Sequence, residues 1–194
     1  MYVINQSDSG CRFTDNEARN GQVNAPATGS IVVKQEQFGP LFQTTLYLSD
    51  VPQAVVNGTE YQSSKIYTFP EGRILVHGVT ATLQQKTTSA LASTLNASST
   101  GAISLGTAAA SATTLSGTMV DLLPSTAFTS SATISVAGTA VSAALASSAQ
   151  FDGTTTAKPV YLNTAYATTT DVDADATQTI SGTVVLTWIW LGDY

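Results

Sequence analysis

The chain has few charged residues for its length of 194 residues, because Asp, Glu, Lys and Arg make up only 10% of it. An average soluble domain has about 25%. Between positions 87 and 157 the only charged side chains are Asp121 and Asp152. The rest of this segment consists mainly of Ala, Ser, Thr, Gly, Leu and Val, which suit half-buried strands and close surface contacts. We therefore expect the protein to act through contact and not through catalysis.

Cysteine and histidine are almost absent, with Cys11 and His77 as the only examples. A single cysteine excludes an intramolecular disulfide, and a thiol nucleophile would need His77 as its partner. A Ser-His-Asp site would depend on the same histidine, which we expect to be an ordinary strand residue. The longest apolar run, Val184 to Leu191, is far shorter than the roughly 20 residues of a transmembrane helix. The sequence predicts no enzyme, no cofactor and no membrane span.

Basic residues are scarce, and the net charge is -6 with a pI near 4.4. Binding to a phosphate backbone needs Lys and Arg, so nucleic acid is not an expected direct partner. Six of the seven basic residues lie in the first 86 positions: Arg12, Arg19, Lys34, Lys65, Arg73 and Lys86. This bias predicts that the amino-terminal part docks on any acidic surface that the protein binds. The first ten residues lack the basic start and apolar run of a secretion signal, so we expect synthesis in the cytoplasm.

Residue patterns predict an all-β protein with one domain. Residues 1–30 are polar and show no apolar periodicity, so we expect an extended N-terminal arm followed by a single β domain over 31–194. Within that domain, Phe42, Thr44, Leu46 and Leu48 alternate with more polar residues, which indicates a strand with one covered face. Residues 182–191 are apolar at nearly every position, and this predicts a central strand.

Turn residues divide the domain into strands. Asn57-Gly58 predicts a hairpin with antiparallel strands, and Pro70-Glu71-Gly72 predicts a tight corner between the β-rich runs 65–69 and 73–83. Gly-Thr pairs recur at irregular spacing, which favours an antiparallel jelly roll or β-sandwich over a solenoid or propeller. Residues 89–96 and 139–150 are rich in Ala and Leu and could be helical, although 139–150 also fits a strand.

A weak candidate for a metal site lies just before the last strand. Asp171, Asp173 and Asp175 alternate along the chain, so in an extended segment their carboxylates would point the same way and could share a hard cation such as calcium. The EF-hand pattern fails here, because Ala176 stands where glycine is needed and Gly182 where the final glutamate is needed. A solvated loop without metal is the expected structure.

Three segments together resemble a known class of virion protein. They are KIYTFPEGRILVHGVTATL (65–83), FDGTTTAKPVYLN (151–163) and SGTVVLTWIWLGDY (181–194). Their texture and order are similar to those of small β-rich proteins in the heads of tailed bacteriophages, which sit on the capsid as cement or decoration subunits. The resemblance covers about two thirds of the chain, from 65 to 194, and none of the segments is a catalytic motif.

The resemblance implies a structural virion protein on the capsid exterior, bound to the major capsid protein and to itself as a homotrimer or homodimer. Arg12, Arg19 and Lys34 would then be the residues of the N-terminal part that dock on the shell. Two other classes stay open. One is a head-fibre or tail-associated module that binds a glycan or receptor through Tyr61, Tyr161 and Tyr166, and the other is a hydrolase that uses two carboxylates.

Overall fold

The computed structural model describes residues 4–7, 10–13, 30–86, 100–129, 137–144, 149–167, 172 and 175–193. These residues form two antiparallel β-sheets. The large sheet has eight strands, in the order β1 (Ile4–Ser7), β2 (Gly10–Phe13), β3 (Ser30–Phe38), β4 (Leu41–Val55), β12 (Ala176–Gly192), β6 (Gly72–Lys86) and β10 (Ala149–Gly153), with β9 (Ala137–Ala144) also paired to β6. The small sheet has four strands, in the order β5 (Tyr61–Thr68), β11 (Pro159–Tyr166), β7 (Thr100–Gly106) and β8 (Leu123–Thr129).

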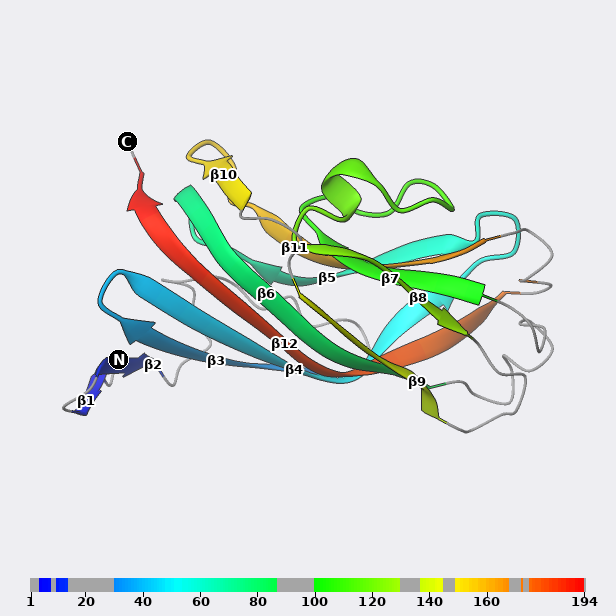
Figure 1. Ribbon diagram of the computed structural model, residues 1–194, viewed down its shortest axis with the longest axis horizontal. Helices are drawn as coiled ribbons and strands as arrows, with labels where there is room; N and C mark the ends of the chain where they lie inside the picture. Colours follow the sequence, from blue (N-terminus) through cyan, green and yellow to red (C-terminus); the bar gives the residue numbers. More distant parts are fainter. Residues whose placement is uncertain are drawn as a thin grey trace.

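The two sheets pack face to face, and Figure 1 shows the long strands β4, β6 and β12 curving around the small sheet. This arrangement confirms the expected all-β sandwich. The hydrophobic core lies between the sheets, and β4, β6 and β12 contribute mainly alternate residues to it. The predicted central strand is also confirmed, because β12 lies between β4 and β6 along almost its whole length.

An aromatic cluster fills the core beneath β12. Trp188 is fully buried and stacks on Phe42, with ring centroids 4.6 Å apart. Phe69 meets the same indole edge-on at 5.4 Å, and Tyr67 meets Phe69 edge-on at 5.4 Å. The indole Nε1 of Trp188 donates a hydrogen bond to Thr44 Oγ1 at 3.0 Å, which satisfies the one polar group that the indole brings into the core.

Both predicted turns exist, but neither joins two paired strands. The turn after Val55 contains Asn57-Gly58 and leads from β4 in the large sheet to β5 in the small sheet. The Pro70-Glu71-Gly72 corner leads back from β5 to β6 in the large sheet. The hairpin prediction is therefore wrong in its pairing, because β4 and β6 both pair with β12, and β5 pairs with β11.

The helical alternative for residues 139–150 is wrong where the structure describes them. β9 covers 137–144 and β10 starts at Ala149, and both lie against β6 as successive parts of one sheet edge. Alanine is a good helix former, but here the pairing with β6 decides the conformation. The other possible helix, 89–96, lies outside the described residues. None of the described segments forms a helix with the length and hydropathy that a membrane span requires.

The described parts of the N-terminal segment continue the large sheet beyond β3. β1 pairs with β2, and β2 pairs with β3 through Arg12 opposite Glu36 and Phe13 opposite Gln35. The remaining positions before residue 30 lie outside the described residues. The extended arm over 1–30 and its boundary at residue 30 stay predictions.

Candidate interaction surface

The face of the large sheet that points away from the small sheet carries four rows of cross-strand neighbours. Each row crosses β3, β4, β12 and β6, and residues opposite each other on neighbouring strands share one face of the sheet. We call these sixteen residues the outer patch. In the strand order β3, β4, β12, β6 its rows are Phe38, Leu41, Ile189, Leu75; Glu36, Gln43, Thr187, Gly78; Lys34, Thr45, Val185, Thr80; and Val32, Tyr47, Thr183, Thr82.

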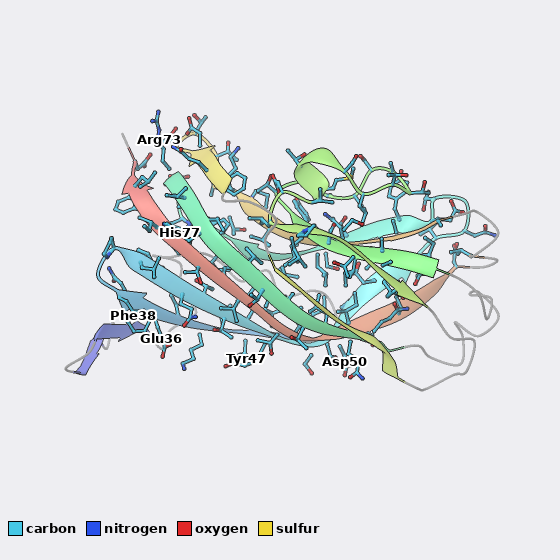
Figure 2. All side chains as sticks on the ribbon, viewed as in Figure 1. Glu36, Phe38, Tyr47, Asp50, Arg73 and His77 are labelled. Carbon is cyan, nitrogen blue, oxygen red and sulfur yellow. The ribbon has the colours of Figure 1, made fainter. Side chains whose placement is uncertain are left out.

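Every residue of the outer patch is at least partly exposed. Its large side chains include Val32, Phe38 and Tyr47, which are 56%, 51% and 46% exposed. Figure 2 shows Phe38 and Tyr47 on the side of the large sheet opposite the small sheet. The row that starts with Phe38 is apolar at all four positions. A continuous apolar row on an exposed face is typical of a surface that contacts another protein.

Lys34 and Glu36 are the only charged residues of the outer patch, and they neutralise each other. Lys34 Nζ lies 3.1 Å from Glu36 Oε1, with the two side chains 45% and 25% exposed. These sixteen residues together are therefore neutral on a chain whose net charge is -6, and the Glu36 row continues on β2 at the backbone position of Arg12. An exposed pair of this kind contributes little to the stability of the fold. A neutral β face is well suited to contact, because covering it requires no unpaired charge to be removed from water.

The outer face of the small sheet differs, because the chain covers part of it. Residues 107–122, between β7 and β8, form a loop that contains the short 3-10 helix η2 (Gly117–Met119). Figure 1 shows this loop arching over the small sheet on the side away from the large sheet. Beneath it, buried Asn163 donates from Nδ2 to the carbonyl oxygens of Ala108 at 3.0 Å and Met119 at 2.9 Å. The sandwich thus has one outer face partly covered by its own loop and one with an exposed strand surface.

Asp121 fixes the base of this loop. Its carboxylate accepts hydrogen bonds from the backbone N–H of Thr107 at 2.8 Å and from the Thr107 hydroxyl at 2.6 Å. Burial raises the pKa of the Asp121 carboxyl above its ordinary value of 3.8, although the two bonds from Thr107 act in the opposite direction. Gly106 allows the loop to approach closely, since a Cβ at that position would collide with the backbone of Thr118 and Met119.

The structure places one of the three predicted docking residues in the outer patch. Lys34 lies in its third row, on β3. Arg12 lies on β2, where its backbone is paired opposite Glu36. Arg19 lies outside the described residues. The structure therefore puts the backbones of Lys34 and Arg12 on neighbouring strands of one sheet, and their docking role stays a prediction.

The predicted metal site is described only in part, because Asp171 and Asp173 lie outside the described residues. Asp175 is described, and its Oδ1 accepts a hydrogen bond from the backbone N–H of Asn57 at 2.8 Å. Its carboxylate thus holds the turn between β4 and β5. Among the described residues no three His, Cys, Asp or Glu side chains form a group that could hold a metal ion.

The remaining candidates are spread over the molecule. His77 is exposed on β6, at a point where the β6–β12 register shifts because Thr187 pairs with Gly78 and Trp188 with Val76. Tyr166 is fully buried, and its hydroxyl donates a hydrogen bond to Gln178 Oε1 at 2.6 Å. The expectation that Tyr166 is available to stack on a sugar is therefore wrong.

The other two tyrosines of the glycan-binding alternative, Tyr61 and Tyr161, are partly exposed. They lie on β5 and β11 of the small sheet, where Tyr161 pairs with Lys65 and Tyr61 with Ala165. The two tyrosines thus lie toward opposite ends of the paired segment. The structure does not bring the three tyrosines together on one face.

Sequence reasoning missed most of the outer patch. Alternation along residues 42–48 separates the two faces of a single strand. It does not show that Tyr47 lies beside Val32 and Thr183, which are far away in the sequence. Comparison of the chain with protein-family models gives no match, and comparison with curated protein sequences gives none either.

Proposed function

We propose that the protein is a structural virion protein that binds the outer surface of a bacteriophage capsid and cements the shell of major capsid protein. The observation that carries this proposal is the outer patch, a wide, neutral β face that exposes Val32, Phe38 and Tyr47. Such a face is suited to adhesion. Contacts across subunit boundaries add binding free energy that must be lost before the shell can open.

The strand order supports a virion role, because it matches a type of β-sandwich that occurs in viral capsid domains. We assign the jelly roll to this chain, because the large sheet contains the order β4-β12-β6-β10 and the small sheet the order β5-β11-β7-β8. Chain connections alternate between the sheets at β4, β5, β6 and β7 in the way that two interleaved Greek keys require. Jelly rolls occur in viral capsid domains and also in lectins, so the fold supports the proposal only by analogy.

Charge and composition support the same location. An acidic chain of net charge -6 is repelled by packaged DNA and is better placed on the exterior of a shell. The Thr and Val residues of the outer patch lose little side-chain freedom when a partner covers them, so wide contact costs little conformational entropy. In this account the protein needs no cofactor and performs no reaction.

Binding to heads that lack the protein tests this function. Purified protein mixed with such heads should co-sediment with them to a saturating ratio, and the decorated heads should rupture at a higher temperature than bare heads. The Lys65→Glu variant changes the net charge on β5 of the small sheet, outside the outer patch. Its binding to heads is a suitable control for an effect of net charge alone. Failure of the wild-type protein to co-sediment, or binding without any gain in head stability, would rule out a cementing role.

The N-terminal segment is expected to assist docking. A variant without residues 1–29 keeps β3 whole and removes Arg12 and Arg19. We expect it to retain the circular dichroism spectrum of a β-sandwich while its occupancy on heads falls. If occupancy stays at the wild-type level, the docking role of Arg12 and Arg19 is wrong.

A further inference from the structure

The charges of the outer patch have an arrangement that can complement itself. Lys34 and Glu36 are two positions apart on the same face of β3. A two-fold interface brings the same patch of two copies together, so each group must meet a suitable group of the same patch. A patch with charges of one sign would repel its copy, whereas adjacent charges of opposite sign can be matched.

We infer that two copies of the chain associate through their outer patches around a two-fold axis that crosses the strands between the Lys34 row and the Glu36 row. The inference deepens the proposed adhesive function and rests on it for its biological meaning. Because both contacts use the outer patch, two copies must separate before either one binds the shell through it. Rotation about this axis places β3 over β3 of the second copy and reverses the order of the rows. Lys34 then meets Glu36 of the second copy, and Glu36 meets its Lys34.

The same rotation also matches the outer two rows. The row of Val32 and Tyr47 lies over the wholly apolar row of the second copy, so Val32 faces Phe38 and Tyr47 faces Leu41. The inner rows bring Thr45 opposite Gln43, two uncharged residues. An axis along the strands through the centre of the patch would instead put Lys34 over Thr80 and Glu36 over Gly78 of the second copy, so neither charge would meet an opposite charge of that copy. The crosswise axis therefore joins opposite charges and apolar groups on β3 and β4, and on β12 and β6 it sets Thr183 and Thr82 over Ile189 and Leu75.

The shape of the sheet permits this contact. Asp50 and Gly182 have positive φ angles of 52° and 144°, and the register between β4 and β12 shifts between Ile180 and Gly182. The four rows of the outer patch lie entirely on one side of this irregularity, and the smaller register shift at His77, between Thr187 and Trp188, lies within the patch at its β6 edge. Two sheets can then pack with their strands nearly aligned, about 10 Å apart, as in other aligned sheet packings.

The size of the patch determines how tightly the copies can bind. The patch is four strands wide and extends over six residue steps along β3, from Val32 to Phe38. With the usual strand spacing and rise per residue, its projected area is roughly 20 Å by 20 Å. This area is about half of the ~800 Å² that each partner contributes to a standard interface. We therefore expect a reversible dimer that dissociates on dilution.

Charge reversal with mixing tests the interface in purified protein, without any capsid present. Lys34→Glu and Glu36→Lys should each weaken self-association at least about tenfold, because each puts like charges face to face in the dimer. An equimolar mixture of the two variants should form heterodimers again, since the charges of one then oppose those of the other. Lys65→Glu and Glu71→Lys make the same changes in net charge on exposed residues outside the outer patch, and should associate like wild type.

Sedimentation velocity over a wide concentration range provides the measurement. A concentration-dependent shift from monomer to dimer, lost in each reversed variant and restored in the mixture, supports the interface. A wild-type monomer at all concentrations, a trimer, or a mixture that stays monomeric would overturn it. Restoration by mixing cannot arise from the pair within one chain, because each chain keeps its own like charges. Failure of head binding with an intact dimer would count against the cementing function and leave this inference standing.

Discussion

Thr44 holds two aromatic side chains in the core of the sandwich. Its Oγ1 accepts the hydrogen bond from Trp188 Nε1 at 3.0 Å, and its hydroxyl also bonds to the fully buried Tyr67. Burial raises the pKa of the Tyr67 hydroxyl far above its ordinary value of 10.0, so this group stays protonated as a hydrogen-bonding neighbour. The single threonine therefore satisfies polar groups from two strands of different sheets.

Thr44→Val should destabilise the protein by about 2–4 kcal/mol, because it keeps the volume of the side chain and leaves two buried polar groups without their partner. Urea unfolding followed by tryptophan fluorescence measures this loss. Thr45→Val is the matched control on the partly exposed outer face and should change the free energy of unfolding by no more than about 0.5 kcal/mol. Equal effects of the two substitutions would show that the Thr44 hydrogen bonds contribute nothing.

Asp121 gives the stability a defined pH dependence. Its folded-state pKa is raised above the ordinary 3.8, so the folded protein binds this proton more tightly than the unfolded chain. The stability that the protonated Asp121 carboxyl provides is fully present below the pKa that this group has in the unfolded chain. It is lost as the pH rises through the pKa of the same group in the folded protein. The Asp121→Asn variant has no ionisable group at this position, so it serves as the reference. The free energy of unfolding of wild type minus that of the variant should decrease as the pH rises above about 4.

Chemical denaturation at a series of pH values measures this difference. Asp152 has a lowered pKa, due mainly to its hydrogen bonds from Thr154, and gives stability that is lost as pH falls. Both proteins carry Asp152, so its contribution cancels. A difference that stays constant or rises with pH would contradict the assigned direction for Asp121.

Among the strands, β12 depends on Gly182 at the point where the large sheet bends. Gly182 has a φ of 144°, and a Cβ there would collide with the backbone of Thr82 and Leu83 on β6. Gly182→Ala should therefore cost about 3 kcal/mol or more, because it combines backbone strain with a steric clash in a central strand. Thermal unfolding measures the cost.

Gly39→Ala is the matched control for this prediction. Gly39 also has a positive φ, of 61°, but a Cβ there would meet nothing within 4 Å. Only the left-handed conformation is then penalised, at about 1 kcal/mol. Similar costs at the two glycines would mean that the close approach of β12 and β6 does not limit the side chain at position 182.

Strand positions were largely predictable, whereas strand partners were not. Alternation marks the inner face of β4, and the apolar run marks β12 as central. The residues Asn57-Gly58 and Pro70-Glu71-Gly72 correctly predict turns, but the same turn chemistry serves a hairpin and a crossing between sheets. Which occurs depends on β12 and β11, the distant strands that pair with β4, β6 and β5.

The loop over the small sheet was not predictable either. Residues 107–122 are mostly Ala, Ser and Thr, which give no strong local signal. Their position depends on Asn163 and Ser104, two buried polar residues of other strands that bond to Met119 and Ala108. Side-chain hydrogen bonds between distant segments leave no periodic pattern in a sequence.

At the scale of the whole molecule, the two outer faces of the sandwich differ in how far the chain itself covers them. The loop 107–122 lies over the small sheet, while the outer patch of the large sheet exposes Val32, Phe38 and Tyr47. A change of Tyr47 to Lys should leave the fold intact and weaken both self-association and binding to heads, because it places an unpaired charge in a contact face. Sedimentation and head-binding measurements check the two effects separately, and unchanged binding in both would show that the outer patch is not a contact surface.

The central claim is that the protein is a component of the capsid exterior. Quantitative mass spectrometry of purified bacteriophage particles, combined with labelling of surface lysines on intact particles, tests this claim most directly. The account predicts a fixed number of copies for each copy of the major capsid protein, with the exposed Lys65 labelled from outside. Absence of the protein from mature particles, or its presence only after the heads are broken open, would contradict the account.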